Sequence, residues 1–477
     1  MEFAETPMSY GLRMKYNMNI TISFDKATLL INNLPDSILS IFNEIKWDSR
    51  TCEYRAPAYC YRDIVLTLVK HQLPYKDCAK QFQPHAFPLK RIITARTYQK
   101  EALDAWQHNG SKGVVVLPTG AGKTILAVLC IEQTRRPTLI HVPTIDLMHQ
   151  WHDVLRAHFD IPIGLLGGGA NDLQPITVAT YDSALIHVAR KGNLFGFIIF
   201  DECHHLPGAQ LQYTAIGSIA PFRLGLTATP ERNDGKEKLL YQLCGSLCFQ
   251  TNIHELKGST LSLYDVVTIE VEMQDEEREA YERARKCYID YLHDEQIVLS
   301  QPNGWNNFLY KSSQNPKGRK AFKAYLRQKK LCQASKSKEL QIWEIVRQHA
   351  KDRILIFTQD NEMAYRIGKR FLWPVLTHHT KIKERTHFLD QFRQGAYAIL
   401  VTSKVLNEGV DVPEANVGII VSGSGSIREH VQRLGRLLRA RDGKFAILYE
   451  LVSKNTSEYF VNKRRRNHSA YQKSHSI

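Results

Sequence analysis

The chain has 477 residues, which at roughly 150 residues per domain suggests about three domains. Hydrophobic residues make up 43% and charged residues 23%, which excludes a disordered chain, a collagen-like fibre and a disulfide-built miniprotein. Lysine and arginine (63) exceed aspartate and glutamate (48) by 15, and this surplus favours a polyanionic partner, nucleic acid first and an acidic membrane surface second.

The first 82 residues predict a small N-terminal domain of mixed structure. In this stretch, residues 1–82, a strand-like segment at Asn19–Phe24 is accompanied by amphipathic segments. The segment Pro84–Arg91 (PHAFPLKR) carries two prolines and predicts a linker. We place the next domain at residues 83–250.

Short apolar runs recur from about residue 95 to residue 250, with helical segments between most of them. They are Val114–Leu117, Thr138–Val142, Ile176–Thr180, Phe197–Phe200 and Arg223–Leu226. A second set follows later in the chain: Arg353–Phe357, Ala398–Val401, Val417–Val421 and Phe445–Tyr449. Strands buried on both faces of a parallel sheet show this pattern, so the predicted fold class is α/β with two parallel-sheet domains.

Between the two sets, residues 274–333 lose the strand pattern and become helical and highly charged. We therefore expect the second α/β domain at residues 251–454, with a helical insert at about 274–333. Residues 455–477 form a basic tail, and its run Lys463–Arg466 is typical of a solvated chain end.

The second half of the insert is strongly basic. On a helix, one face would be shared by Lys320, Lys323, Arg327 and Lys330. Aromatic residues interleave with the basic ones: Phe308, Tyr310, Phe322 and Tyr325. This combination suits phosphate binding with base stacking, or a wedge at a DNA fork. The alternative is a solvated basic face over core aromatics.

A phosphate-binding loop is predicted between a strand and an apolar helical run. Its small residues let backbone N–H groups curl around phosphates, and the helix N-terminus adds positive potential. These residues are Thr119, Gly120, Ala121 and Gly122. Lys123 would reach the β- and γ-phosphates of ATP, and Thr124 would hold Mg²⁺. The strict pattern has glycine at position 117, where this chain has leucine.

Two adjacent carboxylates follow a later predicted strand. Asp201 and Glu202 come directly after Phe197–Phe200, and open α/β sheets bind ligands at the carboxyl ends of such strands. Asp201 is placed to bind Mg²⁺ through its water shell, and Glu202 to orient and deprotonate the attacking water.

Upstream of the loop, Arg96 and Gln99 are candidates for the adenine end of the nucleotide. The Gln99 amide would pair with the adenine edge, and an exposed glutamine is the alternative.

Metal and disulfide chemistry have little support in the sequence. The nine cysteines are scattered without a C-x-x-C pair, so we expect neither a zinc ribbon nor a disulfide framework, and a reducing, cytoplasmic compartment fits. The pairs His204–His205 and His378–His379 lack ligand partners at metal spacing. No run of about 18 apolar residues is present, and the N-terminal residues lack the apolar core of a secretory signal, so we expect no membrane partner.

Seven motifs occur in the order found in superfamily 2 helicases of the DExH type, and the chain resembles that superfamily. They are Gln99, Gly120–Thr124, Val142–Thr144, Asp201–His204, Leu226–Thr229, Gly409–Asp411 and Gln432–Arg436. The resemblance spans residues 95–453 and implies that the two α/β domains are RecA-like.

Within the superfamily, the chain most resembles the XPB family. The stretches that carry this likeness are Asp201–Pro207, Ala220–Thr229, Asn407–Pro413, Ser422–Ser426 and, near the N-terminus, Asp48–Arg50, Tyr54–Ala56 and Tyr61–Asp63. The family implies a DNA-dependent ATPase with 3′-to-5′ translocation or local duplex opening, in nucleotide excision repair or transcription. It also implies an N-terminal domain that senses distorted or damaged DNA, a thumb-like insert and, in archaea, a nuclease partner. We expect a monomer, associated with the nucleoid if the chain is prokaryotic.

The resemblance assigns further residues. Arg436 and Arg439, three apart after Gln432, would reach across the interdomain cleft to the γ-phosphate, and Gly409 and Asp411 would lie at its nucleotide end. Four threonines at predicted strand ends are candidates to bind DNA phosphates, with helix capping as the alternative: Thr144, Thr180, Thr358 and Thr402. Thr227 and Thr229 would couple the nucleotide and DNA sites.

One element departs from the family. XPB proteins carry Arg-Glu-Asp after the Thr-Ala-Thr motif, and this chain has Arg232, Asn233 and Asp234 there. Arg232 and Asp234 are candidate DNA contacts, and the amide at position 233 leaves open how strongly the chain unwinds duplex. The leading hypothesis is an ATP-driven helicase or translocase that acts on forked or distorted duplex and single strands. An annealing translocase, or an ATP-switched scaffold that binds damaged DNA and loads a nuclease, are the alternatives.

Overall fold

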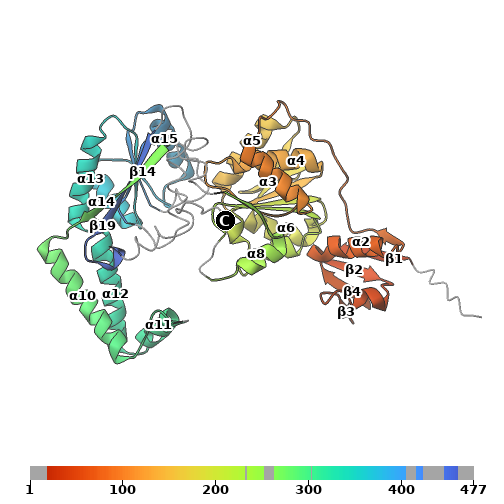
Figure 1. Ribbon diagram of the computed structural model, residues 1–477, viewed down its shortest axis with the longest axis horizontal. Helices are drawn as coiled ribbons and strands as arrows, with labels where there is room; N and C mark the ends of the chain where they lie inside the picture. The colour runs from red at the N-terminus through yellow and green to blue at the C-terminus, as the bar shows by residue number, and fades with distance from the viewer. Residues whose placement is uncertain are drawn as a thin grey trace, which may run out of the picture.

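A computed structural model describes residues 19–230, 234–251, 263–301, 303–403, 415–422 and 445–459. Figure 1 shows three sheet-containing parts in a row, with the N-terminal part at one end and a helical arm at the other. Each sheet in this arrangement corresponds to one stretch of strand signals in the sequence. None of the described helices is both long enough and apolar enough to cross a bilayer.

The N-terminal sheet is mixed, as predicted. Its strand order is β3-β4-β2-β1-β5, antiparallel except between β1 and β5. The strands are β1 (Ile20–Asp25), β2 (Thr28–Asn32), β3 (Lys46–Asp48), β4 (Glu53–Pro57) and β5 (Tyr75–Asp77). The helices are α1 (Asp36–Leu39), η1 (Ala58–Cys60) and α2 (Tyr61–Lys70). Alternating residues of β1 and β2 point inward, so Ile22, Leu29 and Ile31 meet Ile64 and Leu68 of α2 in one core.

The first large sheet has eight strands in the order β13-β6-β12-β11-β7-β10-β8-β9, and only β9 pairs antiparallel. The strands are β6 (Lys112–Val116), β7 (Thr138–Val142), β8 (Ile163–Gly167), β9 (Ala170–Asp172), β10 (Ile176–Thr180), β11 (Phe197–Asp201), β12 (Phe222–Thr227) and β13 (Leu247–Gln250). The helices are α3 (Thr97–His108), α4 (Lys123–Thr134), α5 (Ile145–His158), α6 (Tyr181–Lys191), η2 (Cys203–His205), α7 (Tyr213–Ile216) and α8 (Glu237–Cys244). All five predicted strands are confirmed, because each apolar run is buried between helices on both faces.

The segment predicted to be a linker is packed against this first lobe. Phe87 is 2% exposed and its ring lies 6.3 Å from that of Phe159, while Leu89 forms an isolated bridge to Phe159. The segment is a connection without regular helix or strand, as a linker would be, but the apolar residues between and after its two prolines anchor it to the lobe.

The N-terminal part is fixed to the first lobe by buried contacts. Ile219 of the lobe belongs to the N-terminal core. Arg62 donates to the carbonyl of Pro221 at 2.9 Å, and Asn193 donates to the carbonyl of Ala79 at 2.8 Å. We infer that these two parts move together.

The second large sheet is parallel throughout, with the order β14-β19-β18-β15-β17-β16. Its strands are β14 (Leu263–Val271), β15 (Ile354–Phe357), β16 (Val375–Leu376), β17 (Ile399–Thr402), β18 (Val417–Ile420) and β19 (Phe445–Ser453). Its described helices are α13 (Lys336–Gln348), α14 (Asn361–Phe371) and α15 (Ile382–Gln394). The four predicted strands are confirmed here too.

The insert is helical, as predicted, and projects from the second lobe as an arm (Figure 1). It consists of α10 (Asp275–Asp294), α11 (Gly304–Gln314) and α12 (Pro316–Gln333). Asn315 caps α12 by accepting from the Gly318 N–H at 2.7 Å, and Pro316 starts the helix with its preset φ. Phe308 is fully buried against Tyr288, Tyr291 and Tyr325, so it holds the arm together and cannot stack on a base.

Candidate active site

Strand order brings the predicted chemistry to one edge of the first sheet. Strands β6, β12 and β11 are neighbours and parallel, so their carboxyl ends lie side by side. The phosphate loop follows β6, Thr227 ends β12 and Asp201 ends β11. Leu117, at the position where the strict loop pattern has glycine, is fully buried and donates its N–H to the Thr227 carbonyl at 3.0 Å. The leucine thus belongs to the core beneath the loop.

The loop has the backbone that a phosphate site requires. Gly120 and Gly122 have φ values of +86° and +78°, which favour glycine. A Cβ at Gly122 would lie 2.6 Å from Nε2 of Gln99, so the loop has no room for a side chain there. The hydroxyl of Thr119 is buried and has no hydrogen-bond partner among the described residues. A tight loop with an unsatisfied hydroxyl at the start of α4 fits an anionic oxygen ligand.

The lysine and the two carboxylates meet behind this loop. Lys123 Nζ donates to Glu202 Oε1 at 3.2 Å, and the Glu202 N–H donates to Asp201 Oδ1 at 3.0 Å. Glu202 has φ +46°, a strained conformation for a non-glycine residue of the kind that concentrates at functional sites. Thr124 lies in the first turn of α4, beside Lys123. The donor set of hydroxyl and carboxylate oxygens is the kind that Mg²⁺ prefers.

Burial and charge act in opposite directions on this cluster. Burial would lower the pKa of Lys123, but the carboxylates of Glu202 and Asp201 outweigh it and raise that pKa above its ordinary value. Burial, with the neighbouring Glu202 charge, raises the pKa of Asp201 to about 6. Nearby positive groups are therefore needed to keep both carboxylates ionised, and Lys123 is one of them.

Asp201 is oriented by residues that sequence reasoning missed. Trp151 on α5 donates its indole N–H to Asp201 Oδ2 at 2.8 Å, and Tyr181 donates its hydroxyl to the Asp201 carbonyl at 2.9 Å. Trp151 is 1% exposed. Fifty residues of chain separate Trp151 from Asp201, so only the packing of α5 on this sheet reveals the contact.

A polar chain links Glu202 to the predicted coupling residues. His204 Nδ1 lies 3.4 Å from Glu202 Oε2 and 3.1 Å from the Thr227 hydroxyl. Thr227 donates to the Thr229 carbonyl at 2.9 Å, and the Thr229 N–H donates back to the Thr227 hydroxyl. His204 is buried and lies between the carboxylate and the loop after β12. One side chain therefore contacts both Glu202 and the strand end from which that loop begins.

Gln99 lies at the side of the same loop. It is 3% exposed, which rules out the alternative of an exposed glutamine. Its Oε1 accepts from the Arg96 N–H at 3.0 Å, and its Nε2 donates to the Gly122 carbonyl at 3.2 Å. Tyr98 also ties to the loop, donating to the Ala121 carbonyl at 2.7 Å, and it accepts from Arg96 Nη1 at 3.2 Å.

The four threonines predicted to bind DNA phosphates divide into two pairs. Thr144 and Thr180 cap α5 and α6, each accepting a backbone N–H at 3.2 Å. Thr358 and Thr402 are fully buried and donate to the carbonyls of Asp360 and Ser403. In this conformation neither hydroxyl of this second pair reaches the surface, so the structure gives no support to the prediction that Thr358 and Thr402 bind DNA phosphates.

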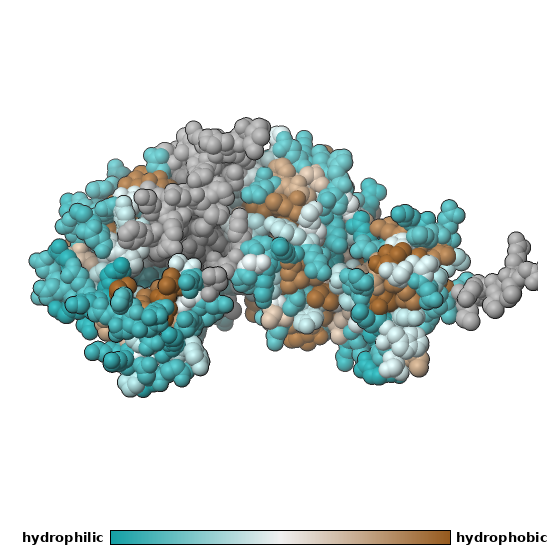
Figure 2. All heavy atoms as spheres, turned by 60° about the horizontal axis from the view of Figure 1, so that its bottom comes forward, coloured by the Kyte–Doolittle hydropathy of each residue, from teal (hydrophilic) through white to brown (hydrophobic). Residues whose placement is uncertain are grey.

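The predicted basic face is present on α12 and is exposed to solvent. Lys320, Lys323 and Arg327 are exposed and have no ion-pair partner among the described residues. Lys330 instead pairs with Glu362 of α14 at 2.7 Å, so its charge is already partly neutralised. Of the interleaved aromatics, only Tyr310 is largely exposed, at 68%. In Figure 2 the forward face of this lobe is mainly hydrophilic.

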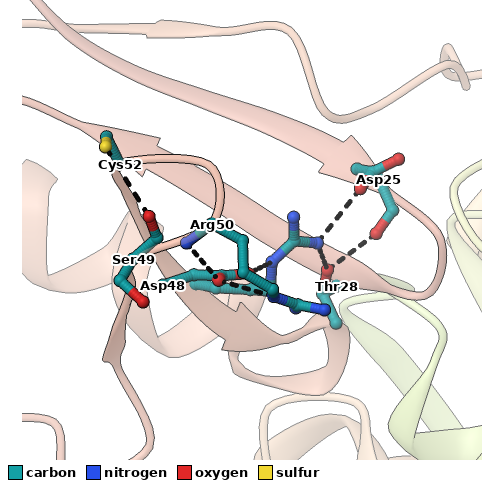
Figure 3. A network of polar contacts seen from close by, with 7 residues as sticks. Asp25, Thr28, Asp48, Ser49, Arg50 and Cys52 are labelled. Atoms are coloured by element: carbon teal, nitrogen blue, oxygen red, sulfur yellow. Dashed lines mark hydrogen bonds and ion pairs between the residues drawn. The ribbon is translucent and has the colours of Figure 1, made fainter.

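A network of polar contacts joins neighbouring strands of the N-terminal sheet (Figure 3). Asp48 accepts from Arg50 at 2.9 Å and from Arg55 at 3.2 Å, and Arg55 also pairs with Asp25 at 3.1 Å. The hydrogen bond from the Arg50 side chain lowers the pKa of Asp48 to about 2. Trp47, on the same strand, is 56% exposed and stands edge-on to Tyr54. The hairpin thus presents an indole and a guanidinium to solvent.

The two large lobes touch through a charged contact. Arg385 of α15 pairs with Asp146 in the first turn of α5, the helix that carries Trp151. Several predicted residues fall outside the described part of the chain: Arg232, Gly409, Asp411, Gln432, Arg436 and Arg439. Asp234 is described and exposed, and its Oδ1 accepts from the Lys236 N–H at 3.4 Å.

Three family models match separate stretches of the chain. The model for the type III restriction enzyme res subunit matches residues 92–232, that for the ERCC3/RAD25/XPB C-terminal helicase matches 319–473, and that for the XPB damage recognition domain matches 22–79. The DNA 3′-5′ translocase XPB2 of Sulfurisphaera tokodaii is 38% identical over 88% of this chain and 95% of its own length. The chain belongs to the XPB family.

Other XPB relatives are more distant and longer. The DNA 3′-5′ helicase XPB of Kineococcus radiotolerans is 34% identical over 82% of this chain and 66% of its own length. The XPB subunit of general transcription and DNA repair factor IIH from Schizosaccharomyces pombe is 26% identical, over 79% of this chain and 46% of its own. The solved helicase domain of Hef from Pyrococcus furiosus aligns with a TM-score of 0.49 at 18% identity, over 78% of this chain and 98% of that one.

Proposed function

We propose that this XPB-family chain is an ATP-driven DNA translocase or helicase that moves 3′ to 5′ and opens distorted or forked duplex. The observation that carries the proposal is the buried cluster at the ends of β6, β11 and β12, where Lys123 contacts Glu202 and His204 links Glu202 to Thr227. This cluster connects the phosphate loop to the loop that follows β12. A motor requires such a connection between its nucleotide site and its DNA site.

At the nucleotide, each residue has one role in the proposal. Lys123 exchanges Glu202 for the β- and γ-phosphate oxygens of ATP, while the loop from Thr119 to Gly122 donates backbone N–H groups. Glu202, once released, accepts a proton from the attacking water. Thr124 and Asp201 would hold Mg²⁺, which neutralises charge on the phosphates when bound.

The proposal also assigns the residues around this centre. Gln99 gives up its bond to the Gly122 carbonyl to pair with adenine, with Arg96 beside it. From the second lobe, Arg436 and Arg439 supply positive charge to the γ-phosphate, with Gln432, Gly409 and Asp411 at the same end of the cleft. Arg385 and Asp146 form an ion pair between the two lobes, so this pair would respond when the lobes approach each other.

Trp151 is a positioning residue in this scheme. Its indole binds Oδ2 of Asp201 while the Glu202 N–H binds Oδ1, so the two donors together fix the orientation of the carboxylate. Groups that orient a metal ligand in this way commonly affect metal affinity about 10–100-fold. Because α5 also carries Thr144 and Asp146, one helix connects a candidate DNA contact, the lobe contact and the metal ligand.

DNA contacts are proposed on three surfaces. The exposed face of α12 binds phosphates through Lys320, Lys323 and Arg327. In the N-terminal part, Trp47 and Arg50 are placed to stack on and hold an unpaired base of distorted DNA. The third surface is formed by the ends of α5 and α6 at Thr144 and Thr180, and Arg232 and Asp234 are proposed as further DNA contacts.

ATPase activity should be measured with no nucleic acid, single strand, duplex, fork and RNA at one salt concentration, because basic proteins lose DNA affinity steeply with ionic strength. Stimulation by DNA and not by RNA supports the proposal. A strand-displacement assay run beside an annealing assay separates a helicase from an annealing translocase. Hydrolysis far slower than DNA dissociation would instead favour the scaffold that loads a nuclease.

A further inference from the structure

A row of aromatic rings lies on the outer surface of the second lobe. The rings of Trp343 and Phe371 are nearly parallel, 3° apart, with centroids at 5.7 Å, and Phe371 stacks on Trp373 at 4.5 Å. Trp343 belongs to α13, Phe371 ends α14 and Trp373 follows it. Both helices lie on the side of the second sheet away from the first lobe (Figure 1). The row is therefore outside the contact between the lobes.

Aliphatic residues extend this row into an exposed apolar face. Leu340 precedes Trp343 by one helical turn and is 56% exposed, and Trp343 is 46% exposed. Leu372 is 89% exposed. The core of the lobe is filled by other residues of α13, among them Ile342 and Ile345. We call Leu340, Trp343, Phe371, Leu372 and Trp373 the Trp343 face.

Leu372 lowers the stability of the fold in two respects. It caps α14 with φ +57°, the left-handed conformation for which glycine is the favoured residue. It also leaves an isobutyl side chain in water. Glycine at this position would relieve the strain and remove the exposed apolar area. A residue that harms folding in both ways indicates that its side chain serves binding.

The charges beside the Trp343 face are mainly positive. Arg366 and Arg370 both pair with one buried carboxylate, Glu339, so the three residues together keep a positive charge. The Arg370 guanidinium also lies 5.5 Å from the centroid of the Phe371 ring. Lys369 is exposed and has no ion-pair partner among the described residues. A ligand of this face therefore meets apolar surface bordered by cations.

We propose that the Trp343 face binds a segment of a protein partner in which aspartate or glutamate flanks aromatic or aliphatic side chains. Tryptophan and arginine are the residues most enriched in the energetic centres of protein interfaces. Phe371 is covered by Trp343 and Trp373 on its faces, and the two leucines have no π-face, so the surface suits side chains better than stacked bases. In a symmetric dimer the same basic border would face itself, which disfavours a second copy.

The test compares Leu372→Gly with Gln296→Gly in the full chain. Gln296 follows α10, is exposed and has φ +52°, so the control makes the same backbone change at another helix end. The probes are two short fluorescein-labelled peptides with the same phenylalanine and leucine positions. One carries aspartate and glutamate between them, and the other carries lysine and arginine.

We expect the wild-type chain and Gln296→Gly to bind the acidic peptide with equal affinity, and Leu372→Gly to bind it about tenfold or more weakly. Thermal unfolding of Leu372→Gly should occur at or above the wild-type temperature, which separates lost binding from lost folding. A Leu340→Lys variant should show the same loss of binding.

Three results of the peptide experiment would overturn the proposal. They are equal binding of both peptides, equal binding by Leu372→Gly and the wild type, and displacement of the acidic peptide by an oligo-dT strand, which would make the face a DNA site. Self-association that is lost in Leu340→Lys would equally contradict it, because the occupant would then be a second copy.

Discussion

Lys123, Asp201 and Glu202 are held by buried partners, whereas Lys320, Lys323 and Arg327 on α12 stand in solvent without an ion-pair partner among the described residues. In the buried cluster, each side chain depends on the position of the next, so one substitution disturbs the whole. On the exposed face the charges act independently, and each would contribute a small, salt-dependent share of the affinity for DNA. The difference predicts that the chemistry depends on a few coupled residues, while the affinity for DNA is the sum of many independent contacts.

The largest effect in the buried region is expected for Glu202→Gln. Without a carboxylate to accept the proton, hydrolysis should fall about 10²–10⁴-fold while ATP binding persists. Single-turnover hydrolysis and equilibrium nucleotide binding measure the two effects separately. Glu101→Gln, an exposed residue of α3, is the control and should match the wild type. Normal hydrolysis in Glu202→Gln would show that Glu202 takes no part in the chemistry. It would also weaken the contrast between the buried cluster and the exposed face of α12.

The variant Trp151→Phe tests whether the indole of Trp151 positions Asp201 for metal binding. It removes the indole donor from Asp201, so the Mg²⁺ concentration needed for half-maximal binding of a fluorescent ADP should rise about 10–100-fold. Trp106→Phe is the matched control, because Trp106 is equally buried and donates at 2.9 Å to the Arg223 carbonyl, away from the loop. If both variants change the Mg²⁺ requirement alike, Trp151 only supports the fold.

The exposed region is tested by changing Lys320, Lys323 and Arg327 together to alanine. Each lost phosphate contact should reduce the slope of log affinity against log salt by about 1, so the triple variant should lose about 3. ATP hydrolysis without DNA should stay at the wild-type rate. Lys330→Ala is the comparison and should change the slope less, since Glu362 already holds that ammonium. An unchanged slope in the triple variant would show that α12 does not touch DNA.

The smallest effect is expected for Asp48→Asn in the N-terminal part. The charge of Asp48 holds Arg50 and Arg55, and its pKa of about 2 keeps it ionised where an ordinary aspartate would titrate near 3.8. Its stabilising contribution is therefore present above about pH 4 and is lost only as the pH falls towards 2. We expect affinity for mismatched duplex to fall within about fivefold and to be unchanged between pH 5 and 8.

The control for that variant is Asp36→Asn, an exposed aspartate of the same part with no ion pair among the described residues. Equal losses on mismatched and perfectly paired duplex would show that the Asp48 network serves general DNA binding and has no preference for distortion.

Local pattern was enough to predict much of this structure. Apolar runs bounded by turns predicted five of the eight strands of the first large sheet and four of the six strands of the second, and the glycines before Lys123 predicted the loop, because both depend on neighbours in the chain. The strands that were missed are β8, β9, β13, β14 and β16. The contacts of Trp151 with Asp201 and of His204 with Thr227 depend on which strands lie adjacent, and no spacing rule contains that information.

What the sequence left open has the same origin. Thr358 and Thr402 lie at strand ends as predicted, but the sequence does not show that their hydroxyls turn inward to nearby carbonyls. For Phe308 the alternative of a core aromatic holds, because the packing of the insert helices buries it. Side-chain direction was the missing quantity in each case.

The most direct test of the account is ATP hydrolysis by Lys123→Ala beside the wild type, with and without forked DNA at one salt concentration. DNA affinity is measured on the same preparations. The account predicts that stimulated hydrolysis falls by about 10²–10³-fold or more, because a preorganised charge at the phosphates is gone, while most DNA affinity is kept. Hydrolysis that continues unchanged in Lys123→Ala would contradict it.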